Sequence, residues 1–475
     1  MTYTLTSVVK QFDPGTRALR NYVNFPTRGG RSLPAYYDVT ATDSTGTAVT
    51  TPLVMCGDTA AVAITDIRTT AHPRRFRVEV QELGDHLLTV QAGSTCTPSG
   101  TALVAQPVRG TALAPQGFTL SAGGLHSLAL MTDDAVKAWG DNSFGQLGDG
   151  TNSNVDRTFA PIKGLSGVVA VSAGEDHSLA LRSDGTVLAW GSNSRGQLSD
   201  ASTYQYQRAT PVAVGGLSGV ISVTAGYWAS LAIVSDGTVR AWGWNQNGQL
   251  GDGTTTDHLT PVAVKGLDNV VALATGEVHT LALRSDGTVR AWGFNGAAQL
   301  GDGTTTARTT PVAVDDLTDV VELAAGHGHS LALKADGTVE AWGNNIFGQL
   351  GEPPSAIVRA TPAPVSGLSG IVHVSTGASS SLALTSDGTV LAWPSDAGTP
   401  ASTGGAPPHV PAVVGGLKTV IAVDAGSGHH LALQSDGTVQ AWGGGGAGQL
   451  GYDVAGNRST PAPVTSLGSV KLPTP

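Results

Sequence analysis

A unit of about 50 residues recurs seven times between Gln116 and Leu472 of this 475-residue chain. Each unit follows the pattern AGxxHSLALxSDGTVxAWGxNxxGQLGDGT, and then TPVAV and GL. Self-similarity at this period is typical of architectures in which one supersecondary unit packs against the next. Because each unit holds four short apolar stretches bounded by glycine-containing turns, we expect four antiparallel strands per unit and a seven-bladed β-propeller. The tryptophans that mark the units are Trp139, Trp190, Trp242, Trp292, Trp342, Trp393 and Trp442.

The residues before the repeats differ in pattern. Stretches such as YYDVTATDS and FRVEVQEL alternate apolar and polar residues, with turn signals at DPG and TRGG, which is typical of a small sandwich. Glycine occupies 64 positions while the apolar fraction is 40%, so the composition indicates tight turns rather than disorder. We therefore expect an all-β protein, with a small β-sandwich-like domain over residues 1–112 and the propeller over residues 113–475.

Charge is divided unevenly along the chain. Residues 1–115 hold 10 Lys or Arg and 8 Asp or Glu, whereas the remainder holds 16 and 28, a net charge of −12. An acidic propeller repels phosphate backbones, so we expect no nucleic-acid partner. The basic stretch from Arg68 to Arg77 is interpreted as a solvated strand edge.

The sequence gives few indications of a compartment. No apolar run reaches the ~18 residues that span a bilayer, and Met1–Lys10 lacks the layout of a signal peptide. We expect a monomer without membrane contact, cytoplasmic as written and secreted if a leader has been removed. The two cysteines, Cys56 and Cys96, allow two interpretations, a disulfide or two ordinary core thiols, between which the sequence does not decide.

Strand order predicts two different ends of the propeller. Since strands alternate in direction, the loops after the first and third strands of a unit emerge at one end, and the Asp-Gly hairpin emerges at the other. The first loop varies from unit to unit whereas the hairpin hardly changes, except that MTDDAV in the first unit has lost its glycine, which predicts a different turn there. Residues 469–472 resemble a first strand, so we expect the two ends of the chain to share a blade.

Most recurring residues are interpreted as structural. The tryptophans are expected between blades, and the asparagines of the NxxGQLG string are expected to bond nearby backbone as turn formers. A histidine recurs in five units, at His126, His177, His279, His329 and His429. We expect it to bond its own turn rather than a metal, and we expect neither a metal nor a cofactor.

The strings AGxxHSLAL, SDGTVxAWG and NxxGQLGxG, over residues 116–472, resemble the regulator of chromosome condensation repeat family. The resemblance implies a seven-bladed propeller that acts by protein contact. Members serve in nuclear guanine-nucleotide exchange, ultraviolet sensing in plants, and inhibition of β-lactamases in soil bacteria through aromatic loop residues. This chain lacks the nuclear regulator's basic tail, and Tyr227 and Ala229 flank Trp228 where the plant photoreceptor has a tryptophan–arginine cluster. In the sixth unit Pro394 replaces the glycine after tryptophan, which predicts an irregular blade.

Aromatic and charged residues at positions that the repeat leaves free are the candidate site. Aromatic anchors with flanking charges are typical of protein-binding surfaces. We therefore favour a scaffold that binds another protein, as an inhibitor or adaptor of the bacterial type. The candidate partner-binding residues are Phe144, Glu175, Asp176, Arg195, Tyr227, Trp228, Trp244, Glu277, Phe294, His327 and Phe347.

Two other functions stay open at this point. One is an enzyme or small-molecule binder, in which Glu175, Asp176, Glu277 and His327 would form an acid–base group at the channel mouth. No GxSxG, HExxH, Walker or CxxC string occurs, so no catalytic residue is assigned and an enzyme is the less favoured interpretation. The other is a guanine-nucleotide exchange factor for a small GTPase, which the family resemblance also implies.

Overall fold

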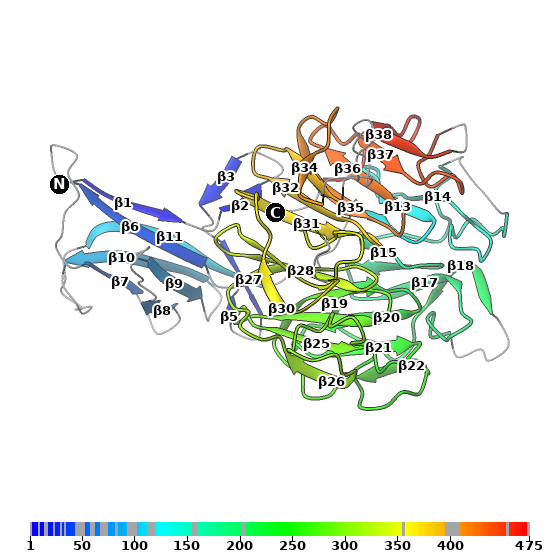
Figure 1. The fold of residues 1–475 in the computed structure, drawn as a ribbon, viewed down its shortest axis with the longest axis horizontal. Helices are drawn as coiled ribbons and strands as arrows, with labels where there is room; N and C mark the ends of the chain where they lie inside the picture. Colours follow the sequence, from blue (N-terminus) through cyan, green and yellow to red (C-terminus); the bar gives the residue numbers. More distant parts are fainter. Residues whose placement is uncertain are drawn as a thin grey trace.

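The structure is a computed structural model in which residues 119–153, 159–200, 206–353, 357–394, 409–452 and 456–472 are described in full. Of residues 1–118, only the strands between Thr2 and Ala112 are described. All regular structure in these parts of the chain is β, and the repeats form the predicted seven-bladed propeller (Figure 1). Among the described residues there is no helix long and apolar enough to cross a membrane.

Each blade is one antiparallel sheet in chain order, from the channel outward. The strands of the first four blades are β12 Leu120–Ala122, β13 His126–Leu130 and β14 Val136–Gly140; β15 Val168–Ala173, β16 His177–Arg182, β17 Val187–Ser192 and β18 Gln207–Ala213; β19 Val220–Ala225, β20 Ala229–Val234, β21 Val239–Gly243 and β22 His258–Ala263; and β23 Val270–Thr275, β24 His279–Arg284, β25 Val289–Gly293 and β26 Arg308–Ala313. The strands of the last three are β27 Val320–Ala325, β28 His329–Lys334, β29 Val339–Asn344 and β30 Val358–Pro364; β31 Ile371–Thr376, β32 Ser381–Thr385, β33 Val390–Trp393 and β34 Ala412–Val413; and β35 Val420–Ala425, β36 His429–Gln434, β37 Val439–Gly443 and β38 Arg458–Pro463.

The hairpin between the second and third strands follows from its Asp-Gly sequence. Gly185 has a φ of 82°, which this residue adopts without strain, and Asp184 accepts a hydrogen bond from the Thr186 N–H at 2.9 Å. The first blade was expected to differ here, and that prediction is wrong. Asp134 takes the glycine position with a φ of 63°, and its N–H bonds Met131 O at 3.0 Å as Gly185 bonds Arg182 O. Aspartate tolerates this left-handed conformation better than most residues do.

The hydrophobic core lies between adjacent blades rather than within one sheet. Trp190 of the second blade is fully buried against Leu128, Leu130 and Val136 of the first blade. Its Nε1 donates a hydrogen bond of 2.8 Å to the main-chain oxygen of Gln146 in the first blade. Equivalent bonds join Trp139, Trp242, Trp292, Trp342 and Trp393 to glutamines of the preceding blades. The tryptophans therefore hold the ring together, as predicted.

The recurring histidine also serves this interface, which corrects the expectation that it bonds its own turn. His126 Nε2 lies 2.9 Å from Ser178 Oγ of the next blade, and Ser178 Oγ donates to Gln146 O. Because the Ser178 hydroxyl donates its only hydrogen to that carbonyl, its oxygen accepts the hydrogen bond from His126 Nε2–H. Burial lowers the pKa of His126 to about 3, and the ring is therefore neutral at pH 7. The equivalent histidines His177, His279, His329 and His429 pair in the same way with Ser230, Ser330, Ser381 and Ser127 of the neighbouring blades.

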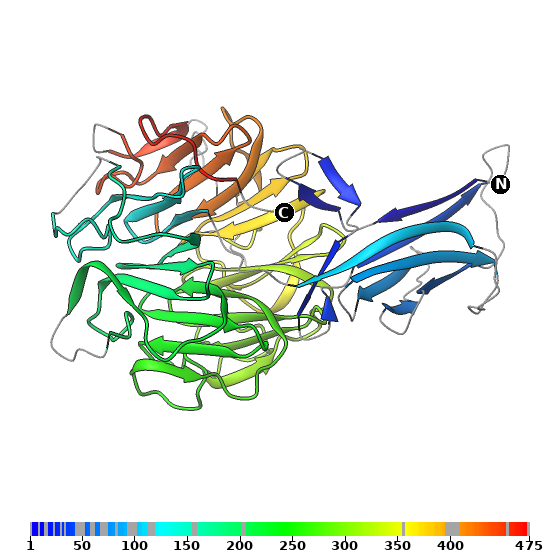
Figure 2. The ribbon, with the colours of Figure 1, turned by 180° about the vertical axis from the view of Figure 1, so that it is seen from behind.

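The two ends of the propeller sequence meet in the first blade, as expected. Thr119–Ala122 supplies most of its innermost strand, and Val470 bridges Met131 at the position where Val168 pairs with Arg182 in the second blade. Lys471 N–H donates to Leu130 O at 2.8 Å. The red strands β37 and β38 accordingly lie beside the cyan β13 and β14 in both views (Figure 1 and Figure 2). This closure completes the first blade with residues from the other end of the chain and leaves the ring with only short, protected edges.

Eleven strands precede the propeller: β1 Thr2–Ser7, β2 Lys10–Asp13, β3 Ala18–Asn21, β4 Asn24–Arg28, β5 Arg31–Ser32, β6 Ala35–Thr42, β7 Leu53–Gly57, β8 Val62–Asp66, β9 Arg75–Val80, β10 Gly84–Ala92 and β11 Ala102–Ala112. They pair as sheets β1-β6-β9-β8, β5-β4-β11-β10-β7 and β2-β3. The expected packing of a sandwich, the Cys56–Cys96 pairing, the basic stretch Arg68–Arg77 and the loop of the sixth blade fall on side chains or residues outside the described part of the chain.

Candidate functional site

The variable loops of every blade open at one end of the ring. Main-chain hydrogen bonds tie the first loop of a blade to the start of its second loop, as in Ser192 N to Asp176 O at 2.8 Å and Trp244 N to Trp228 O at 3.0 Å. The hairpins pair instead with the connections between blades, as in Ser183 N to Gly167 O. The predicted strand polarity is therefore correct, and we call this end the variable end.

The channel opens at the variable end in a shallow hollow of about 90 Å³. Every blade contributes the same three positions to its wall, the last residue of the first strand, the glycine or its equivalent that follows, and the next residue of the loop. The loop residues are Gly124, Glu175, Tyr227, Glu277, His327, Ala378 and Ser427. One side of the hollow therefore carries acidic and aromatic groups, while the other side carries small residues.

Glycine at the second of these positions lets the blades approach one another. A Cβ on Gly174 would lie 2.5 Å from the Gly226 oxygen of the next blade, and one on Gly123 would lie 2.4 Å from Gly174 O. The main chains are close enough to bond directly, with Gly124 N 3.0 Å from Gly174 O and Ser427 N 3.1 Å from Gly123 O. The hollow therefore has a rigid main-chain rim.

Two carboxylates line this rim, Glu175 from the second blade and Glu277 from the fourth. Burial, followed by the charges of Asp176 and Glu277, raises the pKa of Glu175, and a hydrogen bond of 2.8 Å from Ser427 Oγ opposes that shift. Glu277 lies 3.6 Å from His327 Nδ1. Burial lowers the pKa of His327, although Glu277 partly opposes this, so the ring is largely neutral at pH 7. The hollow is thus acidic.

Three aromatic side chains continue from the hollow toward the third blade's second loop. Tyr227 contacts His327, with ring centroids 5.8 Å apart, and contacts Trp228 edge-on at 4.6 Å. Trp228 in turn meets Trp244 edge-on at 5.1 Å. The Arg195 guanidinium of the second blade lies over Trp228, 5.7 Å from its ring centre. We call Tyr227, Trp228 and Trp244 the aromatic cluster; all three are half-buried.

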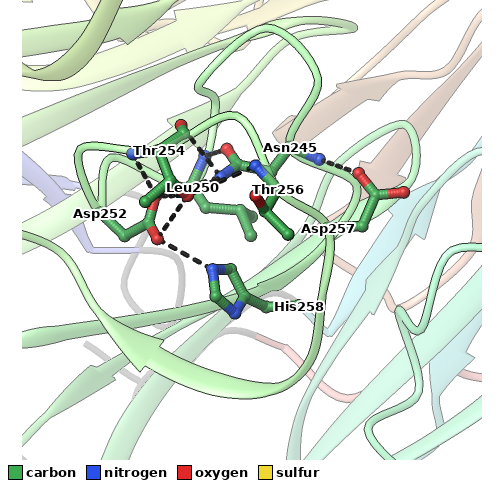
Figure 3. A network of polar contacts seen from close by, with 7 residues as sticks. All are labelled: Asn245, Leu250, Asp252, Thr254, Thr256, Asp257 and His258. Atoms are coloured by element: carbon green, nitrogen blue, oxygen red, sulfur yellow. Dashed lines mark hydrogen bonds and ion pairs between the residues drawn. The ribbon is translucent and has the colours of Figure 1, made fainter.

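A hydrogen-bond network fixes the loop that follows Trp244 (Figure 3). Asn245 Nδ2 donates to Asp252 Oδ1 at 3.0 Å, and Asn245 Oδ1 accepts from Leu250 N at 2.9 Å, as expected for a turn former. Asn245 N also donates to Asp257 Oδ1 at 2.9 Å, while Asp257 Oδ2 lies 3.6 Å from Arg195. The loop bearing Trp244 is thereby joined to the cation over Trp228. A surface held this way loses little side-chain entropy on binding.

The structure brings together eight of the predicted site residues and leaves three apart. The eight are Glu175, Asp176, Arg195, Tyr227, Trp228, Trp244, Glu277 and His327. The aromatic rings of Phe144, Phe294 and Phe347 are 41%, 39% and 56% exposed on other loops of the variable end, and among the described residues no ring contact joins them to the cluster.

Sequence reasoning missed two members of the site. Asp257 lies after the recurring GDGT string, and nothing in its local sequence indicates a pairing with Arg195, 62 positions earlier. Ser427 is one of the variable first-loop residues, yet its contact with Glu175 spans 252 positions. Ser427 belongs to the seventh blade and Glu175 to the second, on either side of the first blade, so their proximity follows only once the ring is known to close after seven blades.

Comparison with models of known families shows to which family the chain belongs. The family model described as RCC1-like domain matches residues 40–321, and models of the regulator of chromosome condensation (RCC1) repeat match residues 336–384, 320–349 and 420–449. The chain belongs to the RCC1-like domain family. The suspected relationship is therefore confirmed, including the repeats of the fifth to seventh blades.

Relatives in this family have diverse names. The probable E3 ubiquitin-protein ligase HERC6 of Homo sapiens is 38% identical over 143 residues, which cover 29% of this chain and 14% of that protein. Protein pim1 of Schizosaccharomyces pombe is 34% identical, with 30% of each sequence covered. The ultraviolet-B receptor UVR8 of Arabidopsis thaliana is 37% identical, over 30% of this chain and 32% of the receptor. The chain thus spans less than a third of the length of these relatives.

Solved structures of the family share the fold. Prp20p from Saccharomyces cerevisiae superposes with a TM-score of 0.62 at 24% identity, over 70% of this chain and 86% of that chain, and its structure is described together with binding to Gsp1p and histones. Human WBSCR16 superposes with a TM-score of 0.64 at 22% identity, over 71% and 96%. At these identities the likeness concerns the fold alone.

Proposed function

We propose that this chain is a protein-binding propeller that holds its partner on the variable end, as an inhibitor or adaptor. The observation that carries the proposal is the aromatic cluster, which lies half-exposed at the rim of the hollow and is held by the Asn245–Asp257 network. Half-buried Trp and Tyr side chains on a rigid support are the typical anchors of protein interfaces. Arg195 and the carboxylates supply the polar surroundings that such anchors usually have.

The size of the hollow favours a protein over a small ligand. Pockets for small molecules usually enclose about 300–1,000 Å³, whereas this hollow is about 90 Å³ and open to solvent. Apolar groups extend well beyond it, since Phe144, Phe294 and Phe347 are also exposed at the variable end. A surface that is broad and shallow, with dispersed apolar anchors, fits a macromolecular partner.

The relatives support a binding role in general terms. Prp20p, which has the same fold, is described as binding Gsp1p and histones, and a further structure shows Kap60 bound to it. In this chain, the excess of carboxylates at the mouth opposes binding to nucleic acid. The surface described above is therefore sufficient for an inhibitor or adaptor, which acts by binding alone.

The experiment is affinity capture with the full chain from an extract of its source organism. The Trp228→Ala/Trp244→Ala variant should lose the proteins that the wild type retains, because removing two anchors weakens an interface by several kcal/mol. Val413→Ala is the matched control, since Val413 is 60% exposed on the outer strand β34 rather than at the variable end. Equal recovery by all three chains, with unchanged melting temperatures, would refute the proposal.

One observation favours a second function, an enzyme or small-molecule binder at the hollow. The raised pKa of Glu175 and the neighbouring Glu277–His327 pair are features of acid–base sites. In that case a ligand would stabilise the chain without any protein partner, and Glu175→Gln would abolish turnover. The exchange of guanine nucleotides on a small GTPase is a third function, and a GTPase among the captured proteins would favour it.

A further inference from the structure

The hollow has a charge that its own residues do not compensate. Glu175 and Glu277 line it, and none of the lining residues is a lysine or an arginine. His327, the one basic residue in the wall, is largely neutral at pH 7 because burial lowers its pKa. The carboxylate of Asp176 adds to the repulsion on Glu175. The hollow therefore attracts a cation from outside the chain.

Hydrogen-bonding capacity at the hollow is also unused. Ser427 Oγ donates to one oxygen of Glu175, Oε2. Glu277 accepts no hydrogen bond from any described residue, and its nearest basic atom, His327 Nδ1, lies 3.6 Å away. An ionised carboxylate offers about four acceptor positions, so most of the positions at this rim face solvent or a partner.

The nearby arginine does not supply the missing charge. Arg195 lies over Trp228 and pairs with Asp257 at 3.6 Å, on the outer side of the aromatic cluster. Its charge is therefore balanced by Asp257, a carboxylate outside the wall of the hollow. Arg195 therefore brings no uncompensated positive charge to the hollow.

The volume of the hollow and the residues around it restrict the class of partner that it can bind. Space for a water molecule requires at least ~10–15 Å³ by this measure, so a hollow of about 90 Å³ has room for a single charged head group and not for a folded segment. The aromatic cluster begins at the same rim, because Tyr227 lines the hollow and contacts Trp228. When a basic side chain of the partner enters the hollow, the apolar groups next to it would thus contact the aromatic cluster.

We infer that the partner inserts a lysine or arginine side chain into the hollow beside Glu175 and Glu277 and lays an adjacent apolar side chain on Trp228 and Trp244. This inference rests on the proposed function and deepens it by naming the chemistry of the partner. The hydrocarbon stem of the inserted residue would pass the Tyr227 ring, as long basic side chains commonly do. The net charge of −12 on the propeller would speed the approach of a basic partner.

The test uses a display library of disulfide-closed loop peptides, selected against the full chain. Selection on the wild type should enrich clones that carry Lys or Arg next to an apolar residue. Binding of such a clone should weaken about tenfold or more when the chain carries Glu175→Gln and Glu277→Gln, which keep the shape and remove the charge. Replacing the basic residue of the clone by Met should weaken wild-type binding similarly and should add no further loss on the double glutamine variant.

The outcomes separate this inference from the proposed function. Clones that depend on Trp228 and Trp244 but carry no enriched basic residue would overturn the inference and leave the proposed function standing. Clones with a basic residue that bind the double glutamine variant as tightly as the wild type would also overturn the inference. A library from which the wild type selects nothing beyond what the double alanine variant selects would overturn both. Thermal denaturation confirms that each variant is folded.

Discussion

The Asp424 carboxylate accepts a hydrogen bond of 2.8 Å from the main-chain N–H of Ala122, a residue 302 positions earlier in the chain. The bond joins the innermost strand of the last blade to that of the first. Elsewhere in the ring this position is occupied by serine, threonine or alanine; Ser172, for example, accepts from Ala225 N at 2.9 Å. The ring thus has a carboxyl acceptor where the two chain ends meet, and hydroxyl or methyl side chains elsewhere.

Replacing Asp424 should weaken the closure of the ring. The carboxylate is buried and also accepts from Ser375 Oγ and Ala425 N, both at 3.0 Å, so Asp424→Ala leaves buried donors without their acceptor. We expect a loss of about 2–4 kcal/mol in the free energy of unfolding. Asp424→Ser, which copies the residue found in other blades, should lose less. Denaturant unfolding of the full chain measures both, and equal stability of all three chains would contradict the expectation.

The stability of the ring should fall at alkaline pH because of His373. Burial favours the neutral ring, but the charge and hydrogen bond of Glu322, the Val423 carbonyl and the charge of Asp424 outweigh it and raise the pKa of His373 to about 9. A folded-state pKa above the ordinary value of ~6.5 stabilises the fold fully below that pH, and the gain is lost as pH rises through 9. The loss should be on the order of 3 kcal/mol.

This alkaline loss is measured by unfolding wild type and His373→Gln in parallel from pH 6 to pH 10, at a common ionic strength. The variant lacks the titrating group that faces Glu322 and Asp424, so its stability should change little between pH 6.5 and 9. The wild type should be the more stable chain at pH 6.5, and the two should converge near pH 10. Parallel curves would show that His373 is not the group responsible.

An exchange of two residues should test the bond between blades. His329 Nε2 lies 3.0 Å from Ser381 Oγ, and the next interface holds the same pair with the residues exchanged, Ser380 and His430, also at 3.0 Å. His329→Ser alone removes a buried partner and should cost about 1–3 kcal/mol. The double variant His329→Ser/Ser381→His copies the next interface and should recover part of that loss. Thermal unfolding compares the three chains, and a double variant less stable than the sum of its single changes would contradict the interpretation.

Local sequence predicted the parts of the propeller that local residues control. The Asp184–Gly185 turn and the Asn245 turn lie within a few residues of the groups they bond, so their patterns were sufficient. The first-blade turn was mispredicted because Asp134 adopts a positive φ that glycine usually supplies. The histidine was assigned to its own turn because its acceptor, Ser178, belongs to another repeat, and the spacing within one repeat gives no sign of that.

The repeat pattern was sufficient to predict a seven-bladed ring with a repeated hairpin at one end and variable positions at the other, because each blade's strands and turns are specified within about 50 residues. Which of the variable positions meet depends on the closed ring. Glu175 contacts Ser427 and Arg195 pairs with Asp257 because the curvature of the ring and the course of the loops bring distant repeats together. Such contacts depend on the geometry of the closed ring, which no single repeat encodes.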